Sequence, residues 1–271
     1  MPPGKHDFDL TSFFPLFSSY TYHLINDAWS LTYTTCSVLQ DFASDGVVYL
    51  ELRTTPRAMP AAGMTKADYV RNVLEAISQF EAKSSTMHTR LILSVDRRNS
   101  LSEALETVEL AAQFADQGVV GLDLCGDPTA GGIERLAPAF AKARHIAPGL
   151  GLTLHFAEAE CSGTKEELDM LLAWKPDRIG HVIHVPGPVR QAIILRGGMG
   201  LELCLSCNVH AGMIRGGFES QLVFSLSPIC RSIFWRIGNL LTGIVTSESG
   251  GRWQMSLSFY VYVDLSPRFQ C

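Results

Sequence analysis

Residues 151–184 read GLTLHFAEAECSGTKEELDMLLAWKPDRIGHVIH, and this stretch decides the fold. An apolar run at 151–160 ends in polar residues, an amphipathic stretch follows at 163–174, and a second apolar run begins at Arg178. Runs this apolar are typical of parallel strands that are buried on both faces. The stretch therefore predicts two parallel strands joined by a helix.

The same pattern continues on both sides of this unit. Similar apolar runs occupy four further segments, at 47–57, 90–98, 119–127 and 200–208. Amphipathic stretches lie between them, at 65–83 and 100–117. Thr65 and Asp68 resemble a capping box at the start of the first of these stretches. Six such units in succession predict either a (β/α) barrel or a doubly wound sheet.

The ends of the apolar runs favour the barrel. Each run ends in polar side chains, and a barrel enzyme builds its site from the carboxyl ends of many strands. A doubly wound sheet gathers its ligand residues at one switch point, usually after a Gly-rich turn. No G-x-G-x-x-G follows a predicted strand in this sequence. We therefore predict the α/β fold class and a (β/α) TIM-type barrel with about six of the usual eight strands.

The two ends of the sequence differ from the middle. Residues 8–46 have a helical pattern with no predicted strand before them, and the alternation of strands and helices stops near residue 218. The remainder is rich in Ser and Gly and fits neither periodicity. We predict a partial barrel domain at 1–218 and a divergent C-terminal tail at 219–271.

Composition limits the class of protein and its partners. The 271 residues are 46% apolar and carry a formal net charge of -5, which gives no basic surface for nucleic acid. No uncharged apolar run is long enough to span a membrane, and the N-terminal apolar run is interrupted by Pro15. Seven Cys at irregular spacing do not indicate a disulfide framework. We expect a cytoplasmic protein with reduced thiols and no membrane partner.

A candidate metal and proton-transfer site lies at the ends of two neighbouring predicted strands. His155 and Glu158 form an H-x-x-E, and His181 ends the next run, with His184 as a second candidate. A His can ligate zinc, a nearby Glu can shuttle protons, and a second His can polarise a metal-bound water. The alternative is a core imidazole beside a solvated carboxylate.

Other polar residues could surround a ligand at the same end of the sheet. Arg57 could hold a phosphate with help from the hydroxyls of Thr54 and Thr55, or be an ordinary surface side chain. Asp96 could accept a hydrogen bond from a ribose hydroxyl, or pair with one of the two arginines that follow it. Gly126 would let a ligand approach the backbone closely.

Taken in order, six segments resemble the adenosine deaminase superfamily. They are VVYLELRTTPR, SVDRR, VVGLDLCGDP, LHFAE, DRIGHV and LELCLSCNV, within residues 8–218. The similarity is greatest to the branch that acts on N-methylated AMP. The resemblance implies a (β/α) barrel with one catalytic zinc. It also implies hydrolytic loss of ammonia or methylamine from a purine nucleoside or nucleotide.

The resemblance further implies roles for individual residues. His155 would be a zinc ligand, Glu158 the proton donor to the purine ring, and His181 the residue that activates the zinc-bound hydroxide. Gly126 would lie against the base. The sugar and phosphate would be surrounded by four side chains, those of Thr54, Thr55, Arg57 and Asp96.

The sequence departs from the family at two metal-ligand motifs. An H-x-H pair on the family's first strand and an adjacent Asp-Asp pair on its last strand have no counterpart; His23 and Asp264 stand alone. In addition, Val182 follows His181 where many members have Gly. Two alternatives therefore stay open: a nucleotide-binding or interaction protein that derives from a deaminase and lacks catalysis, and another type of barrel metal hydrolase.

Overall fold

A computed structural model describes residues 15, 17–83, 87–202 and 204. The predicted tail at 219–271 and the end of the last predicted strand, 205–208, lie outside the described residues, as do residues 8–14. Within the described part of the chain, no helix is both long enough and apolar enough to cross a membrane.

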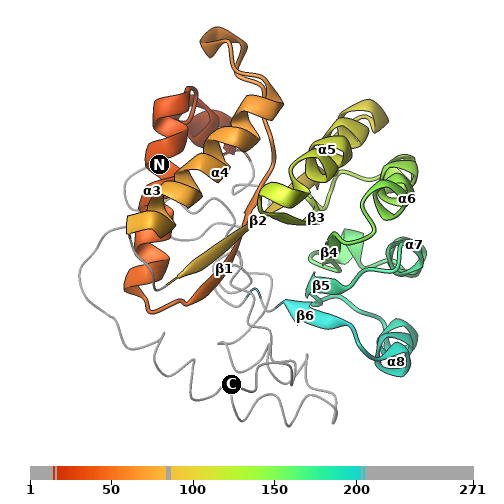
Figure 1. Cartoon of the computed structure of the whole chain (residues 1–271). Helices are drawn as coiled ribbons and strands as arrows, with labels where there is room; N and C mark the ends of the chain where they lie inside the picture. Colours follow the sequence, from red (N-terminus) through yellow and green to blue (C-terminus); the bar gives the residue numbers. More distant parts are fainter. Residues whose placement is uncertain (1–14, 16, 84–86, 203, 205–271) are drawn as a thin grey trace, which may run out of the picture.

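One parallel sheet forms the centre of the structure, and its strands follow one another in chain order (Figure 1). The strands are β1 (Tyr49–Thr54), β2 (His88–Asp96), β3 (Val119–Cys125), β4 (Gly151–Phe156), β5 (Arg178–His181) and β6 (Gly200–Glu202). A doubly wound sheet would reverse its strand order at a switch point. The sheet is therefore an incomplete (β/α) barrel, which confirms the predicted fold class.

Helices lie along the outside of the curved sheet (Figure 1). They are α3 (Ala28–Ser44), α4 (Lys66–Lys83), α5 (Leu101–Gln113), α6 (Ala137–Ile146), α7 (Lys165–Ala173) and α8 (Gly187–Arg196). Of these, α3 precedes β1, and each of the others follows a strand. The short elements are η1 (Phe17–Thr21), α2 (Tyr22–Leu24), η2 (Pro60–Ala62), η3 (Ala115–Gln117), η4 (Ile133–Leu136) and η5 (Glu160–Ser162). The predicted capping box precedes α4, where Thr65 and Asp68 each accept the other's backbone N–H.

The curvature of the sheet is shown by a contact between its first and last described strands. Arg53 Nη2 on β1 lies 2.7 Å from Glu202 Oε2 on β6. Neighbouring strands are about 4.8 Å apart, so five steps across a flat sheet would separate β1 from β6 by about 24 Å. Two side chains cannot bridge that distance, and the sheet must curl until its inner faces meet.

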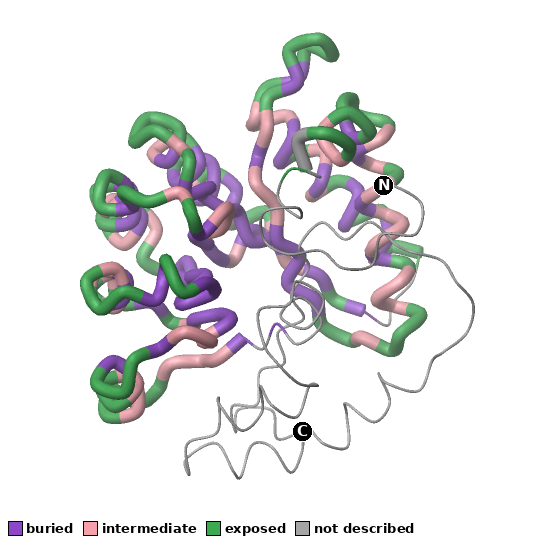
Figure 2. The backbone as a smooth tube through the Cα atoms, turned by 180° about the vertical axis from the view of Figure 1, so that it is seen from behind, coloured by how far each residue is buried: buried purple, intermediate pink, exposed green. Residues whose placement is uncertain are grey.

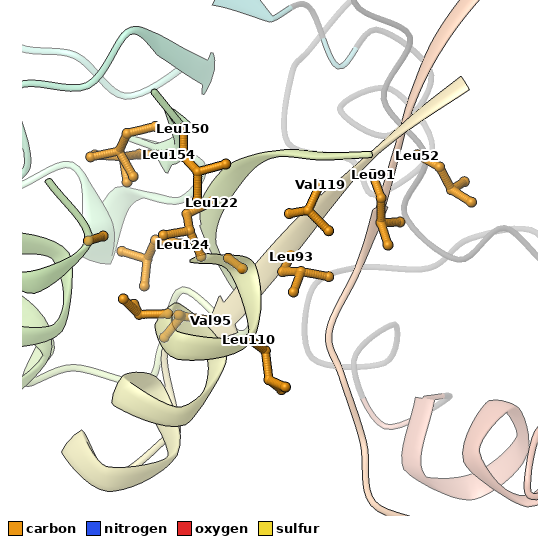
Figure 3. Close-up of a cluster of buried hydrophobic side chains, with 14 of the residues drawn as sticks. Leu52, Leu91, Leu93, Val95, Leu110, Val119, Leu122, Leu124, Leu150 and Leu154 are labelled. Atoms are coloured by element: carbon orange, nitrogen blue, oxygen red, sulfur yellow. The ribbon is translucent and has the colours of Figure 1, made fainter. Parts of the chain in front are cut away.

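The two faces of the sheet have different chemistry. Leucines and valines of the outer face pack beneath the helices, as Figure 3 shows for Leu93 and Val95 near Leu110 of α5. The inner face instead carries buried polar side chains, among them Glu51, Arg53 and Asp123. Figure 2 shows that the strands form the buried centre of the described chain. Apolar and polar residues thus alternate in β1 and in the second halves of β2 and β3.

Candidate active site

Three of the predicted site residues converge at the carboxyl ends of β4 and β5. The rings of His155 and His181 lie with their centroids 5.3 Å apart. Glu158 follows β4, and its Oε1 lies 3.6 Å from His181 Nε2. All three side chains are buried. Glu158 Oε2 is buried as well and has no hydrogen-bond partner among the described residues. A buried carboxylate oxygen without a partner is costly, and such an atom indicates a place for a ligand.

His155 is oriented by Asp123 on β3. Its Nδ1 lies 3.0 Å from Asp123 Oδ1, while Ser94 donates to Asp123 Oδ2 at 2.9 Å. Burial alone would raise the pKa of Asp123, but the nearby Arg53 and His155 hold this pKa below its ordinary value. Asp123 is therefore an ionised acceptor that fixes a proton on Nδ1 of the ring. With Nδ1 engaged by Asp123, a metal ion or substrate would have to be met by Nε2.

The pKa of His155 moves the other way. Burial would lower this pKa, yet the charge and hydrogen bond of Asp123, together with the charge of Glu158, raise it. The imidazole is thus held in an environment that favours positive charge. A bound cation would satisfy the same environment.

The backbone around these three residues is held in unusual conformations. Ala157, His181 and Val182 have positive φ angles of 51°, 62° and 55°. The loops after β4 and β5 hydrogen-bond to each other, with Val182 N donating to the Phe156 carbonyl at 2.9 Å. By strict alternation His181 would face away from Arg178 and Gly180; the left-handed conformation turns its side chain towards Glu158 instead. Strained backbone of this kind clusters at functional sites.

Arg57 lies at the rim of the same end of the sheet. Its guanidinium covers the ring of Tyr22, with Cζ 4.2 Å from the ring centroid, and Nη2 donates to the Ile25 carbonyl at 2.7 Å. No carboxylate pairs with Arg57 within the described residues, so its charge is not neutralised there. Tyr22 was not singled out by the sequence pattern, because its contact with Arg57 joins segments 35 residues apart.

The other predicted rim residues are engaged in contacts within the chain. Thr54 Oγ1 lies 2.7 Å from the Tyr69 hydroxyl, and Thr55 Oγ1 lies 3.5 Å from Cys125 Sγ. Burial raises the pKa of the Cys125 thiol, so this sulfur stays neutral. Both threonines therefore line the rim from part-buried positions rather than project freely from it.

Asp96 forms the ion pair that the sequence left as one of its alternatives. Both of its oxygens accept from the Arg98 side chain, at 2.9 and 2.6 Å. Gly126 lies against this pair, because a Cβ at that position would meet Asp96 Oδ1 at 2.7 Å, and its φ is +100°. Close approach of the Asp96 carboxylate thus requires glycine here, independently of any ligand.

A buried ion-pair network below the site was not predicted from the sequence. Arg178 Nε lies 2.8 Å from Glu202 Oε1 and its Nη2 lies 2.6 Å from Glu51 Oε2. Arg53 connects Glu202 to Asp123, at 2.7 and 3.5 Å. The available signal was the placement of charges at alternate positions inside apolar runs, as in LELR and LDL. Charges there must pair, because an isolated buried charge is too costly.

The described residues include a ligand of the type that zinc prefers, but fewer ligands than a zinc ion needs. His155 with its carboxylate partner has the form of a zinc ligand. The inner face and its mouth carry four buried carboxylates against two guanidiniums: Glu51, Asp123, Glu158 and Glu202 against Arg53 and Arg178. A cation is thus favoured by charge. However, zinc usually takes three or four protein ligands, and the described residues include no group of three suitable side chains.

Comparisons with known proteins identify the family. The family model described as adenosine deaminase matches residues 4–221. The chain belongs to the adenosine deaminase family. The N6-methyl-AMP deaminase of Danio rerio is 41% identical over 181 residues, which are 64% of this chain and 51% of that protein. The corresponding human protein is 40% identical over 185 residues, 65% of this chain and 51% of its own length.

Solved structures of family members have the same arrangement of strands and helices. The Arabidopsis N6-mAMP deaminase MAPDA matches with a TM-score of 0.70 and 34% identity, over 78% of this chain and 63% of that chain. Arabidopsis ADAL complexed with GMP matches equally well, over 62% of its chain. This adenosine deaminase family member spans about half the length of the curated relatives that it matches.

Proposed function

We propose that this chain serves in the zinc-dependent hydrolytic deamination of a purine nucleotide. The proposed reaction converts N6-methylated AMP and water into IMP and methylamine, and deamination of adenosine to inosine is the related possibility for a nucleoside. One observation carries the proposal: beside the two converging imidazoles of His155 and His181, a buried carboxylate oxygen of Glu158 has no hydrogen-bond partner within the described part of the chain.

The residues have distinct roles in this proposal. His155 contributes one zinc ligand, held in orientation by Asp123. Zinc, when bound, supplies a hydroxide at neutral pH. His181 accepts the proton of the attacking water. Glu158 in its protonated form donates a proton to the purine ring, which makes the carbon that bears the amino group more electrophilic.

The charge at the rim supports a nucleotide rather than a nucleoside. Among the described residues no carboxylate pairs with Arg57, and a guanidinium in this state suits a phosphate monoester. Relatives with GMP or IMP bound are consistent with a nucleotide. We place Thr54, Thr55 and Asp96 around the sugar and phosphate, and Gly126 against the base.

The test is to supply residues 1–271 with zinc and follow methylamine release from N6-methyl-AMP and ammonia release from adenosine. We expect zinc-dependent release from the nucleotide, slower than about one turnover per second because the described residues supply one ligand. Glu158→Gln should slow release by about 10²- to 10⁴-fold. Glu160→Gln, two residues away and exposed, is the matched control and should have no effect. Equal rates for Glu158→Gln and the unaltered chain would exclude the proposed role.

A second function is favoured by the ligand count alone. A site with the one zinc ligand found among the described residues could bind nucleotides without turning them over. Tight binding of IMP with no zinc uptake and no methylamine release would establish this function and contradict the first.

A further inference from the structure

The Arg57 guanidinium is contacted by the side chain of Tyr22 and by the backbone of the same segment. The ring of Tyr22 covers one face of the guanidinium, and the Ile25 carbonyl accepts from Nη2 at 2.7 Å. Both contacts come from the segment at α2, which precedes all six strands in the sequence. The orientation of Arg57 therefore depends on this segment as much as on β1.

A stacked guanidinium is suited to one kind of ligand. The aromatic ring occupies the face of the planar cation, so the remaining N–H groups point outward in the plane. An oxyanion with two oxygens at the right spacing can accept from such an edge. The tyrosine ring carries no charge and does not occupy the N–H donors, so these donors can still bind an anion. A carboxylate partner would occupy them.

Arg98, the other cation at the rim, has different partners from Arg57. Arg98 is held by both oxygens of Asp96 and is neutralised by them. The hydroxyl of Tyr22 lies within the influence of both arginines and of Asp96; burial raises its pKa, and the charge of Arg98 partly opposes this effect. Tyr22 is thus near both arginines: Arg98 is paired with Asp96, whereas Arg57 pairs with no carboxylate among the described residues.

We propose that Tyr22 is a specificity-determining positioning residue, which holds Arg57 ready for the phosphate of a nucleotide and so favours nucleotides over nucleosides. This inference rests on the proposed function, because it assumes a purine ligand at the same mouth. It assigns the preference for a phosphate monoester to a residue outside the barrel strands.

The test measures binding, so that it does not depend on turnover. Dissociation constants of IMP and of inosine, which differ only in the phosphate, are measured by calorimetry for the whole chain and three variants. Tyr22→Leu removes the aromatic face and should weaken IMP about 3- to 30-fold, the range of a cation–π contact, while inosine binding is unchanged. Tyr22→Phe keeps the face and should bind IMP within about twofold of the unaltered chain.

Tyr33→Leu is the matched control, because Tyr33 is an exposed tyrosine on α3 that stacks on Trp29 and not on Arg57. It should change neither constant. Equal weakening of IMP and inosine by Tyr22→Leu would overturn the inference, and so would a loss in Tyr22→Phe as large as in Tyr22→Leu. If the unaltered chain binds IMP no better than inosine, the phosphate preference is wrong although a purine site remains. If it binds neither, the proposed function itself fails.

Discussion

Glu202 provides a direct test of the ion-pair network inside the barrel. Its Oε2 accepts from Arg53 Nη2 at 2.7 Å, and its Oε1 lies 2.8 Å from Arg178 Nε and accepts from Thr153 Oγ1 at 2.8 Å. The Glu202→Gln substitution preserves the shape of the side chain but removes its charge. One of its oxygens also becomes an NH₂ group, which cannot accept from a guanidinium.

The expected loss of stability follows from the burial of these groups. Breaking a buried ion pair by removing one partner costs about 3–5 kcal/mol. The lower end applies here, because Gln keeps one acceptor and the two arginines keep Asp123 and Glu51 as partners. We therefore expect the free energy of unfolding to fall by about 3 kcal/mol, which lowers Tm by about 6–12 °C for a chain of this size.

The matched control is Glu106→Gln. Glu106 pairs with Lys66 at the same distance, 2.7 Å, but its side chain is 52% exposed whereas that of Glu202 is 2% exposed. An exposed pair contributes about 1 kcal/mol or less. Urea unfolding of both variants measures the difference. A loss below about 1 kcal/mol for Glu202→Gln, or equal losses for the two variants, would refute the reasoning.

The stability deficit of Glu202→Gln should depend on pH in a definite direction. Burial would raise the pKa of Glu202, but the charges of Arg53 and Arg178 outweigh burial and lower this pKa. A carboxyl group whose pKa is lowered by folding stabilises the fold above its unfolded-state pKa of about 4.3. That contribution is lost as the pH falls through the lower folded-state pKa. The deficit of Glu202→Gln should therefore be full at pH 7 and shrink below about pH 4. A deficit that stayed constant down to acid unfolding would contradict the charge-based explanation.

Two glycine-related substitutions test the backbone of the site. Gly126→Ala should destabilise the fold by about 2–3 kcal/mol, because its Cβ would meet the Asp96 carboxylate at a positive φ, whereas Gly187→Ala, with nothing within 4 Å, should be neutral. At position 182, where φ is 55°, the Val182→Gly variant should be more stable than Val182→Ala by about 1 kcal/mol. Val95 lies inside a strand and is the control: there the Ala variant should be more stable than the Gly variant. Thermal unfolding of the four variants measures both differences, and a Gly variant that is the less stable one at both positions would contradict backbone strain at Val182.

The strands of the fold were predictable from the apolar runs of the sequence. All six described strands lie within or overlap the predicted apolar runs, since burial on both faces requires such runs. Strand ends were less accurate: the run at 47–57 contains β1, but the strand ends at Thr54. Helix α5 ends at Gln113 and a short turn follows, where the pattern suggested one element to residue 117. The helices α6 and α8 are short and contain Pro138 and Pro188 in their first turns, so their patterns were too weak to identify separately.

The site was predictable in residue type but not in geometry. Reactive side chains at strand ends indicated His155, Glu158 and His181, because parallel strands bring their carboxyl ends to one edge. Alternation alone would have turned His181 to the wrong face, and a positive φ in a non-Gly residue has no sequence signal. Asp123 was visible only as a charge in an apolar run. Contacts between distant segments, such as that of Tyr22 with Arg57, follow from the fold and not from local pattern.

The charged interior connects the curvature of the sheet to the orientation of the site. In many barrels bulky apolar side chains fill this space, and they tolerate small changes of curvature. Here Arg53 must reach Glu202 on the far strand and Asp123 on the near one, and both distances depend on how far the sheet curls. Asp123 in turn fixes the ring of His155. Direct contacts through Arg53 and Asp123 thus link β6 to His155, and we expect a change at either edge of the described sheet to shift this imidazole.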